Sequence, residues 1–128
     1  MKRPSRAASA GAPLPLTPVE FHILLSLADG DRHGYAILQD VSQRSDNQVR
    51  LRTGTLYTVI KRMLDSGWIA EAETPADEAD ERRRYYRLTP IGRDVVRNEA
   101  KRLQALVTLA QEKRVLGRPR RIAPERAR

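Results

Sequence analysis

The sequence predicts a mainly α-helical fold with one small β-hairpin and a long C-terminal helix. Two threonine–proline pairs, at positions 17–18 and 89–90, have the form of helix starts. Between them the apolar residues follow helical spacing up to about residue 66 and then alternate, as in strands, up to residue 88. We therefore expect three helices, then a hairpin, then a fourth and longer helix.

The first helix is expected from residue 18 to about residue 28. Thr17 occupies the N-cap, Pro18 the first helical position and Glu20 the third, which together form a capping box. Asp29-Gly30 supplies the stop signal. Apolar residues recur between these signals at helical spacing, namely Phe21, Leu24, Leu25 and Ala28.

The second helix is expected over residues 34–44, and the third from about residue 54 to 66, after a polar connection over 45–50. The apolar residues of the third helix share one face, because they lie at positions i, i+3, i+4, i+7 and i+8. They are Leu56, Val59, Ile60, Met63 and Leu64. The opposite face is polar and carries Thr55, Thr58, Lys61, Arg62 and Asp65, with Tyr57 at the border.

The hairpin follows directly. Apolar and polar residues alternate from Trp68 to Glu73, and they alternate again in the returning strand from Arg84 to Leu88. The segment between them, Thr74 to Glu81, is polar and contains a proline, which is typical of a turn.

Thr89 is expected to cap the last helix, which runs from Pro90 to about Leu116 and ends at Gly117. This order of elements is that of a winged helix-turn-helix domain with an appended helix. We therefore assign residues 16–89 to that domain and residues 90–116 to a C-terminal dimerisation helix. Residues 1–15 and 117–128 are basic and poor in apolar side chains, so we expect two disordered tails.

The charge of the chain does not by itself reveal a partner. The formal net charge is +8. Residues 1–12 contain three basic and no acidic residues, and residues 113–128 contain seven basic residues and one acidic residue. The middle of the chain is thus slightly acidic, and DNA binding by the folded domain has to be argued from patterning.

Composition excludes several functional classes. The chain has no cysteine, which removes disulfides, thiol catalysis and cysteine-based zinc sites, and two histidines are too few for a metal cage. No nucleophile elbow or phosphate-binding glycine loop is present. We expect no enzyme activity, metal or cofactor. No apolar run reaches membrane-spanning length and no secretory signal is recognisable, so we expect a cytoplasmic protein that makes no contact with a membrane.

Three strings in a fixed order resemble the PadR family of transcriptional regulators. His33-Gly34-Tyr35 begins the second helix, Gly54-Thr55-Leu56-Tyr57 begins the third, and the run 83–89 closes the hairpin. The match covers roughly residues 16–110. The resemblance implies a winged helix-turn-helix fold, a dimer formed through the C-terminal helix and, in most members, repression. Some members respond to small molecules at the dimer interface, but nothing in this sequence identifies an effector.

The chain departs from the family pattern at the third helix. Arg52-Thr53 stands where the family usually has a Ser-Pro pair, and Thr58 replaces a usual proline. It is therefore open whether Thr53 or the preceding residue caps this helix, and the details of base contacts are open as well.

We interpret the third helix as the recognition helix, with one face in the core and the other in the major groove of DNA. Candidates for base contacts are Thr55, Thr58 and Lys61. Candidates for phosphate contacts are Arg50, Arg52, Tyr57 and Arg62, and Thr53 completes this expected set. Tyr35 could donate to a phosphate or pack on the third helix, and both interpretations stay open. His33 is interpreted as part of the start of the second helix.

The hairpin combines opposite charges. Arg82, Arg83 and Arg84 are expected to bind backbone phosphate, whereas carboxylates would be repelled there. We hypothesise that the acidic residues point away or pair with the arginines and so restrain nonspecific binding, and that replacing all six by glutamine strengthens it. The alternative is a solvated, locally ion-paired loop. The acids are Glu71, Glu73, Asp77, Glu78, Asp80 and Glu81.

The apolar stripe of the last helix continues beyond the winged domain and must be covered. Pairing with a second copy is one solution, and folding back on the first helix of the same chain is the other. The expected dimer contacts are Val96, Ala100, Leu103, Leu106, Val107 and Ala110. Beyond this helix, residues 116–121 resemble the Gly-Arg-Pro core of a minor-groove arm, for which a plain basic tail is the alternative.

Together these features favour a sequence-specific double-stranded DNA-binding transcriptional regulator, a repressor that acts as a homodimer on a palindromic operator. The alternative is a winged-helix module that binds another protein and uses its basic tails for nonspecific anchoring. The operator sequence, the regulated genes and any effector lie beyond the sequence.

Overall fold

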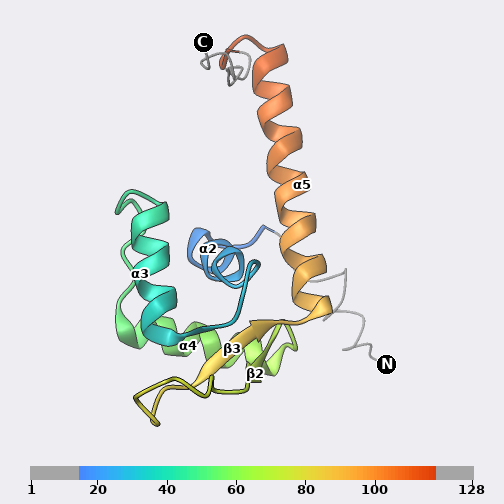
Figure 1. Cartoon of the computed structure of the whole chain (residues 1–128). Coiled ribbons are helices and arrows are strands. Elements are labelled where there is room, and N and C mark those ends of the chain that lie inside the picture. Colours follow the sequence, from blue (N-terminus) through green and yellow to red (C-terminus); the bar gives the residue numbers. More distant parts are fainter. Residues whose placement is uncertain (1–14, 118–128) are drawn as a thin grey trace, which may run out of the picture.

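The computed structural model describes residues 15–117, and this part of the chain consists of four helices and a small antiparallel sheet. The sheet lies at one edge of the molecule, at the bottom of Figure 1. The helices are α2 (Pro18–Ser26), α3 (Gly34–Arg44), α4 (Thr53–Asp65) and α5 (Pro90–Glu112), and the strands are β1 (Arg32–His33), β2 (Ile69–Ala72) and β3 (Tyr85–Leu88). The mainly helical fold with a hairpin is confirmed. None of these helices is apolar over a length sufficient to cross a bilayer.

The sheet has a third strand that the sequence did not predict. Its order is β1-β3-β2, with Arg32 opposite Tyr86 and His33 opposite Tyr85. A strand of two residues is too short to show a period, so only pairing with β3 defines it. The consequence is that the hairpin is joined to the start of α3, which immediately follows β1.

The core lies between α2, α3, α4, the sheet and the first half of α5. Trp68, at the junction of α4 and β2, is buried in it. The second half of α5 projects away from this body, as Figure 1 shows. The buried apolar residues include Ile23, Leu24, Ile37, Val41, Leu56, Ile60, Met63, Ile69, Tyr86 and Val95.

The predicted helix starts are confirmed at α2 and α5. Thr17 Oγ1 accepts from the backbone N–H of Glu20 at 3.1 Å, and the Glu20 carboxylate accepts from the N–H of Thr17 at 2.9 Å. Thr89 Oγ1 accepts from the N–H of Gly92 at 3.0 Å. α3 is capped as well, because Nδ1 of His33 accepts from the N–H of Ala36 at 3.2 Å.

Helix ends differ from the sequence expectation by a few residues. α2 ends at Ser26, because the chain continues into a tighter turn in which Leu27 N–H donates to the Leu24 carbonyl. α4 runs over 53–65 instead of about 54–66, and α5 ends at Glu112 instead of near 116. The N-cap of α4 is Arg52, so Thr53 is the first helical residue and not the cap.

A close approach at Gly92 fixes the start of α5 against the hairpin. A Cβ atom at this position would lie 1.9 Å from the carbonyl oxygen of Trp68, so only glycine fits. The same carbonyl accepts from the backbone N–H of Thr89 at 3.1 Å. The direction in which α5 leaves the winged domain is therefore set by backbone contacts with the start of β2.

A nearly buried carboxylate, Glu99, lies on α5 and is paired with Arg102 of the same helix. Glu99 is only 2% exposed, and Arg102 Nε and Nη2 donate to its two carboxylate oxygens, each at 2.8 Å. The Arg102 hydrogen bonds hold the pKa of Glu99 below its usual value, and the backbone N–H of Leu16 adds to this effect. Residues 1–14 and 118–128, which make up all but one residue of each expected tail and the end of the arm-like segment, lie outside the described residues.

Candidate nucleic-acid interface

Helix α4 has the two faces that a recognition helix needs. Leu56, Val59, Ile60 and Met63 are buried against the rest of the domain. The expected base-contact residues, Thr55, Thr58 and Lys61, are all exposed, and so is Thr53. An open hollow of about 520 Å³ lies over this outer face, lined by Arg52, Gly54, Thr55, Thr58, Val59 and Arg62.

The start of α4 has neither a capping side chain nor an acidic residue. The side chain of its N-cap, Arg52, makes no capping hydrogen bond, and the first turn has no acidic residue. The first backbone N–H groups of the helix are thus left for an outside acceptor, at the positive end of the helix dipole. Arg50 and Arg52 are exposed beside it and form no salt bridge within residues 15–117.

At Gly54, in this first turn, neither the backbone conformation nor the packing requires glycine. A Cβ atom there would meet no other group within 4 Å, and its φ is not in the left-handed region. Glycine in a helix costs about 0.5–1 kcal/mol relative to alanine. The absence of a side chain instead leaves the helix start open to close approach from outside.

The other two cations of α4 are engaged within the chain. Arg62 Nη2 donates to the Glu20 carboxylate at 2.9 Å, which links α4 to the capping box of α2. Lys61 Nζ lies 3.6 Å from the Asp65 carboxylate, and both of these side chains are largely exposed. Lys61 is therefore easily released to another acceptor, whereas Arg62 also has a structural contact to keep.

The two tyrosines near α4 have different surroundings. Tyr57 lies over the start of α3, since a Cβ atom at Gly34 would be 2.3 Å from its hydroxyl oxygen. Tyr35 is 55% exposed, and its hydroxyl accepts from Gln39 of its own helix at 3.3 Å. Of the two, Tyr57 makes the α3–α4 contact and Tyr35 presents its ring to solvent.

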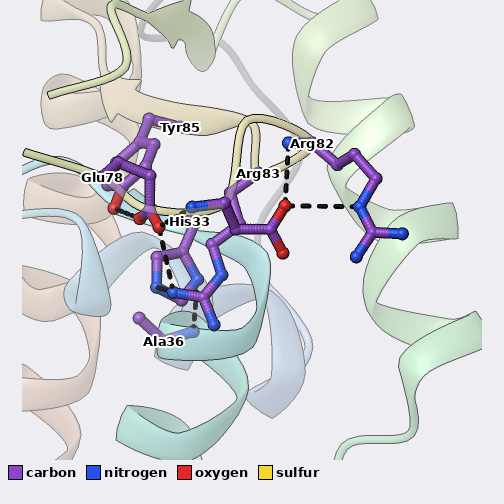
Figure 2. Close-up of polar contacts among 7 residues, drawn as sticks. His33, Ala36, Glu78, Arg82, Arg83 and Tyr85 are labelled. Atoms are coloured by element: carbon purple, nitrogen blue, oxygen red, sulfur yellow. Dashed lines mark hydrogen bonds and ion pairs between the residues drawn. The ribbon is translucent and has the colours of Figure 1, made fainter. Parts of the chain in front are cut away.

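Each arginine of the hairpin loop is paired with a carboxylate. Arg82 Nε lies 3.3 Å from Asp80, and Arg83 Nη1 lies 3.5 Å from Glu78. Figure 2 shows Arg83 beside Glu78 in a close-up. Arg84 Nη1 lies 2.9 Å from Glu71, on the opposite strand. The arginine side chains remain 91%, 41% and 68% exposed in sequence order. Three of the six acids thus compensate the three arginines within the hairpin, whereas Glu73, Asp77 and Glu81 form no salt bridge within residues 15–117.

Glu78 is the best-connected of these acids, and no sequence signal distinguished it from its neighbours. Its side chain is 7% exposed and accepts hydrogen bonds from the Tyr85 hydroxyl and from the backbone N–H of Asp80. The Tyr85 hydrogen bond is the main reason that the pKa of Glu78 lies below its usual value, and Arg83 lowers it further. Glu78 therefore stays ionised and holds the loop in place.

His33 connects this loop to α3. Its ring packs edge-on against Tyr85 with the centroids 5.2 Å apart, and its Nε2 lies 3.3 Å from Arg83 Nη1 (Figure 2). Because Nδ1 accepts from Ala36, the neutral ring carries its hydrogen on Nε2, and the Arg83 contact is one of packing. Burial first, and the Arg83 charge second, lower the pKa of His33 below its ordinary value.

A pocket of about 410 Å³ separates the hairpin loop from the helix-turn-helix. The loop contributes Asp80 and Arg82–Arg84, and the helices contribute Tyr35 and Tyr57; His33, Gly34 and Tyr86 complete the lining. Hydroxyl and guanidinium groups of separate elements thus face one space. This combination suits a phosphate-bearing partner.

The expected dimer residues fall into two groups. Val96 is 6% exposed and belongs to the core of its own chain. Leu103 and Ala110 are half-buried, and Ala100, Leu106 and Val107 are exposed. Further apolar side chains, Leu109, Val115 and Leu116, are exposed near the same end. The stripe therefore packs on its own chain at first and then continues into solvent.

Comparisons with known sequences agree with this geometry. The profile of the "Transcriptional regulator PadR-like family" matches residues 23–98. The transcriptional regulator Rv3488 of Mycobacterium tuberculosis is 32% identical over 88 residues, which cover 69% of this chain and 78% of that protein. An uncharacterized protein of Lysinibacillus sphaericus is 35% identical over 71 residues, and the match covers 56% of this chain and 64% of that protein.

Solved structures show the same fold. A transcriptional regulator from Clostridium thermocellum superimposes with a TM-score of 0.61 at 26% identity, over 73% of this chain and 87% of that one. Bacillus subtilis PadR, solved in complex with operator DNA, gives a TM-score of 0.55 at 22% identity, over 62% of this chain and 45% of that one. With the family profile covering more than half of its length, the chain belongs to the PadR-like family of transcriptional regulators.

Proposed function

We propose that this regulator binds double-stranded DNA sequence-specifically, as a homodimer on a palindromic operator, and acts as a repressor. The observation that carries the proposal is the division of α4, whose apolar face is buried and whose threonine- and lysine-bearing face is open. A helix with this division can enter the major groove while the domain behind it stays intact. The B. subtilis PadR structure with operator DNA provides a precedent on the same fold.

Base contacts are assigned to the outer face of α4. Thr55 and Thr58 offer both a hydroxyl and a methyl group, which suit base edges and the thymine methyl, and Lys61 suits guanine. The backbone N–H groups at Thr53, together with Arg50 and Arg52, are assigned to a phosphate at the bare start of the helix.

The hairpin and the two tyrosines are assigned to the flanking backbone. Arg82 and Arg84 are the most exposed arginines of the loop, and they face the same pocket as Tyr35 and Tyr57. Side chains of this kind fix the register of a protein on the duplex without reading its sequence.

Dimerisation is assigned to the free half of α5. Leu103, Leu106, Val107 and Ala110 lie at helical spacing on the part that projects from the domain. A second copy covering this stripe would place two α4 helices for half-sites about one or more turns of DNA apart. Repression follows when such a dimer occupies a site that overlaps a promoter.

Footprinting on genomic fragments, followed by titration of the protected duplex at several salt concentrations, tests the proposal. We expect a protected inverted repeat and a log–log salt slope that indicates several phosphate contacts. Thr55→Ala and Thr58→Ala should relax the choice of sequence at defined positions, whereas Arg52→Gln should weaken all sequences alike. Absence of any salt-dependent duplex binding would contradict the proposal and favour the protein-interaction alternative.

A further inference from the structure

The loop of the hairpin is fixed to the helix-turn-helix by one set of contacts. We call it the wing network and define it as His33, Glu78, Arg83 and Tyr85. Glu78 accepts a hydrogen bond from Tyr85 and forms an ion pair with Arg83. Arg83 packs against the His33 ring, and His33 caps α3 by accepting from the N–H of Ala36 (Figure 2). The network thus joins residues from β1, the loop and β3 to the first turn of α3.

Arg83 differs from its two neighbours in this setting. Its side chain is 41% exposed, against 91% for Arg82 and 68% for Arg84. Its guanidinium contacts a carboxylate that is nearly buried, whereas the acids beside Arg82 and Arg84 are 37% and 54% exposed. Moving Arg83 to a phosphate would leave the Glu78 carboxylate with one partner fewer, so this exchange is the least favourable of the three.

We propose that Arg83 is a positioning residue: through the wing network it fixes the loop against the start of α3, so that Arg82 and Arg84 meet phosphate, and it does not contact phosphate itself. The proposal rests on the proposed DNA-binding function. It assigns Glu78, an acid on a surface meant for a polyanion, a positive contribution to DNA binding. Simple electrostatics assigns Glu78 the opposite sign, because removing a carboxylate should increase attraction to DNA.

The sign of the Glu78→Gln effect on DNA affinity is the primary test. The matched control is Glu81→Gln, the same change at an exposed acid of the same loop that has no salt bridge among the described residues. We expect the control to bind duplex DNA as tightly as the unmodified chain or slightly more tightly. We expect Glu78→Gln to bind about 3- to 10-fold more weakly, because a charged hydrogen-bond centre of the network is lost. Tighter binding by both variants would overturn the proposal.

A double-variant cycle separates positioning from direct contact. If Arg83 acts through Glu78, then Arg83→Gln should cost little more in DNA affinity once Glu78→Gln is present. If Arg83 contacts phosphate itself, the two effects should add. Additive losses would therefore refute the positioning role even if Glu78→Gln alone weakens binding.

A measurement without DNA tests whether the wing network forms, independently of the proposed DNA binding. The His33 ring can be titrated by NMR in the full-length chain and in Arg83→Gln. Since the Arg83 charge lowers the pKa of His33, we expect the pKa to rise in this variant. An unchanged His33 pKa would show that the contact is absent in solution and would overturn the proposal. If the His33 pKa rises in Arg83→Gln but the unmodified chain does not bind DNA, the DNA-binding function is refuted and, with it, the role assigned to Arg83.

Discussion

The arginines beside the start of α4 have no acidic partner within the described residues, whereas those of the hairpin loop are paired with carboxylates. Arg50 and Arg52 lie beside a helix start that has no capping side chain and no acid, and they form no salt bridge within the described residues. Arg82, Arg83 and Arg84 each pair with a carboxylate of the hairpin. The start of α4 can therefore bind an anion without losing an internal contact. An arginine of the hairpin loop can bind an anion only by giving up its carboxylate partner.

If the proposed function holds, this difference accounts for DNA binding by a slightly acidic domain. Exposed ion pairs such as Arg84–Glu71 contribute only about 0–1 kcal/mol, so their exchange for a phosphate costs little. At the same time, paired cations attract DNA of any sequence less strongly than free ones. The helix start would then supply most of the attraction, and the hairpin would add contacts only after docking.

The largest loss of operator affinity is expected when an acidic residue is placed at the start of α4. Thr55→Glu places a carboxylate at the third helical position, which favours the helix itself. We expect unchanged or higher thermal stability and a loss of operator affinity of about 100-fold, because juxtaposed like charges cost several kcal/mol. Thr108→Glu, at an exposed position of α5, is the control. Operator affinity within twofold of the unmodified chain would show that α4 does not face DNA.

Filling the open space at Gly54 should separate folding from binding. Gly54→Ala should stabilise the fold by up to about 0.5–1 kcal/mol, since alanine is the better helix residue and its Cβ meets nothing within the chain. We expect about tenfold weaker operator binding if the DNA backbone approaches this turn. Denaturant unfolding and fluorescence titration measure the two effects, and parallel gains in both would contradict close approach.

Salt dependence should distinguish the free from the paired arginines. Arg52→Gln should reduce the log–log salt slope by about 0.9, as expected for the loss of one phosphate contact. Arg84→Gln should reduce it by less, because Glu71 already compensates part of its charge. Equal reductions would mean that the hairpin pairs do not persist in solution.

Freeing Arg84 should have a smaller effect of the opposite sign. Glu71→Gln removes its exposed partner at 2.9 Å and should strengthen binding to nonspecific duplex by about 2- to 5-fold. This variant refines the test in which all six hairpin acids are replaced, since it leaves Glu78 and the wing network intact. Unchanged nonspecific affinity would reject the idea that the acids restrain binding.

The smallest expected effect is that of pH on His33. Its pKa in the folded chain is lowered by burial and by Arg83, while Glu78 and Asp80 act in the opposite direction and Tyr85 packs on the ring. A lowered pKa means that the folded state binds fewer protons, so this contribution to stability is complete above the unfolded-state value near 6.5 and declines as pH falls through the folded-state value. Thermal unfolding between about pH 5 and 7 should show less dependence in His33→Asn, which retains a capping side chain.

Local sequence signals were sufficient to predict the four helices, the hairpin and the two faces of α4. The capping box at Thr17, the Thr89 cap and the apolar face of α4 are local signals, because each depends on residues within one or two turns. The family strings added which helix should be the recognition helix. The sequence also indicated that the acids and arginines of the hairpin could pair, without showing which pairs form.

Features that depend on contacts between residues far apart in the sequence could be established only from the tertiary structure. Strand β1 exists because Arg32 and His33 meet β3 more than fifty positions later, and Val96 is covered by its own core although it lies on the same stripe as the exposed Leu106. Glu78 and Glu81 are equivalent in composition, yet Glu78 is nearly buried and hydrogen-bonded while Glu81 is exposed. Such distinctions arise from packing between elements, which the periodicity of a single segment does not encode.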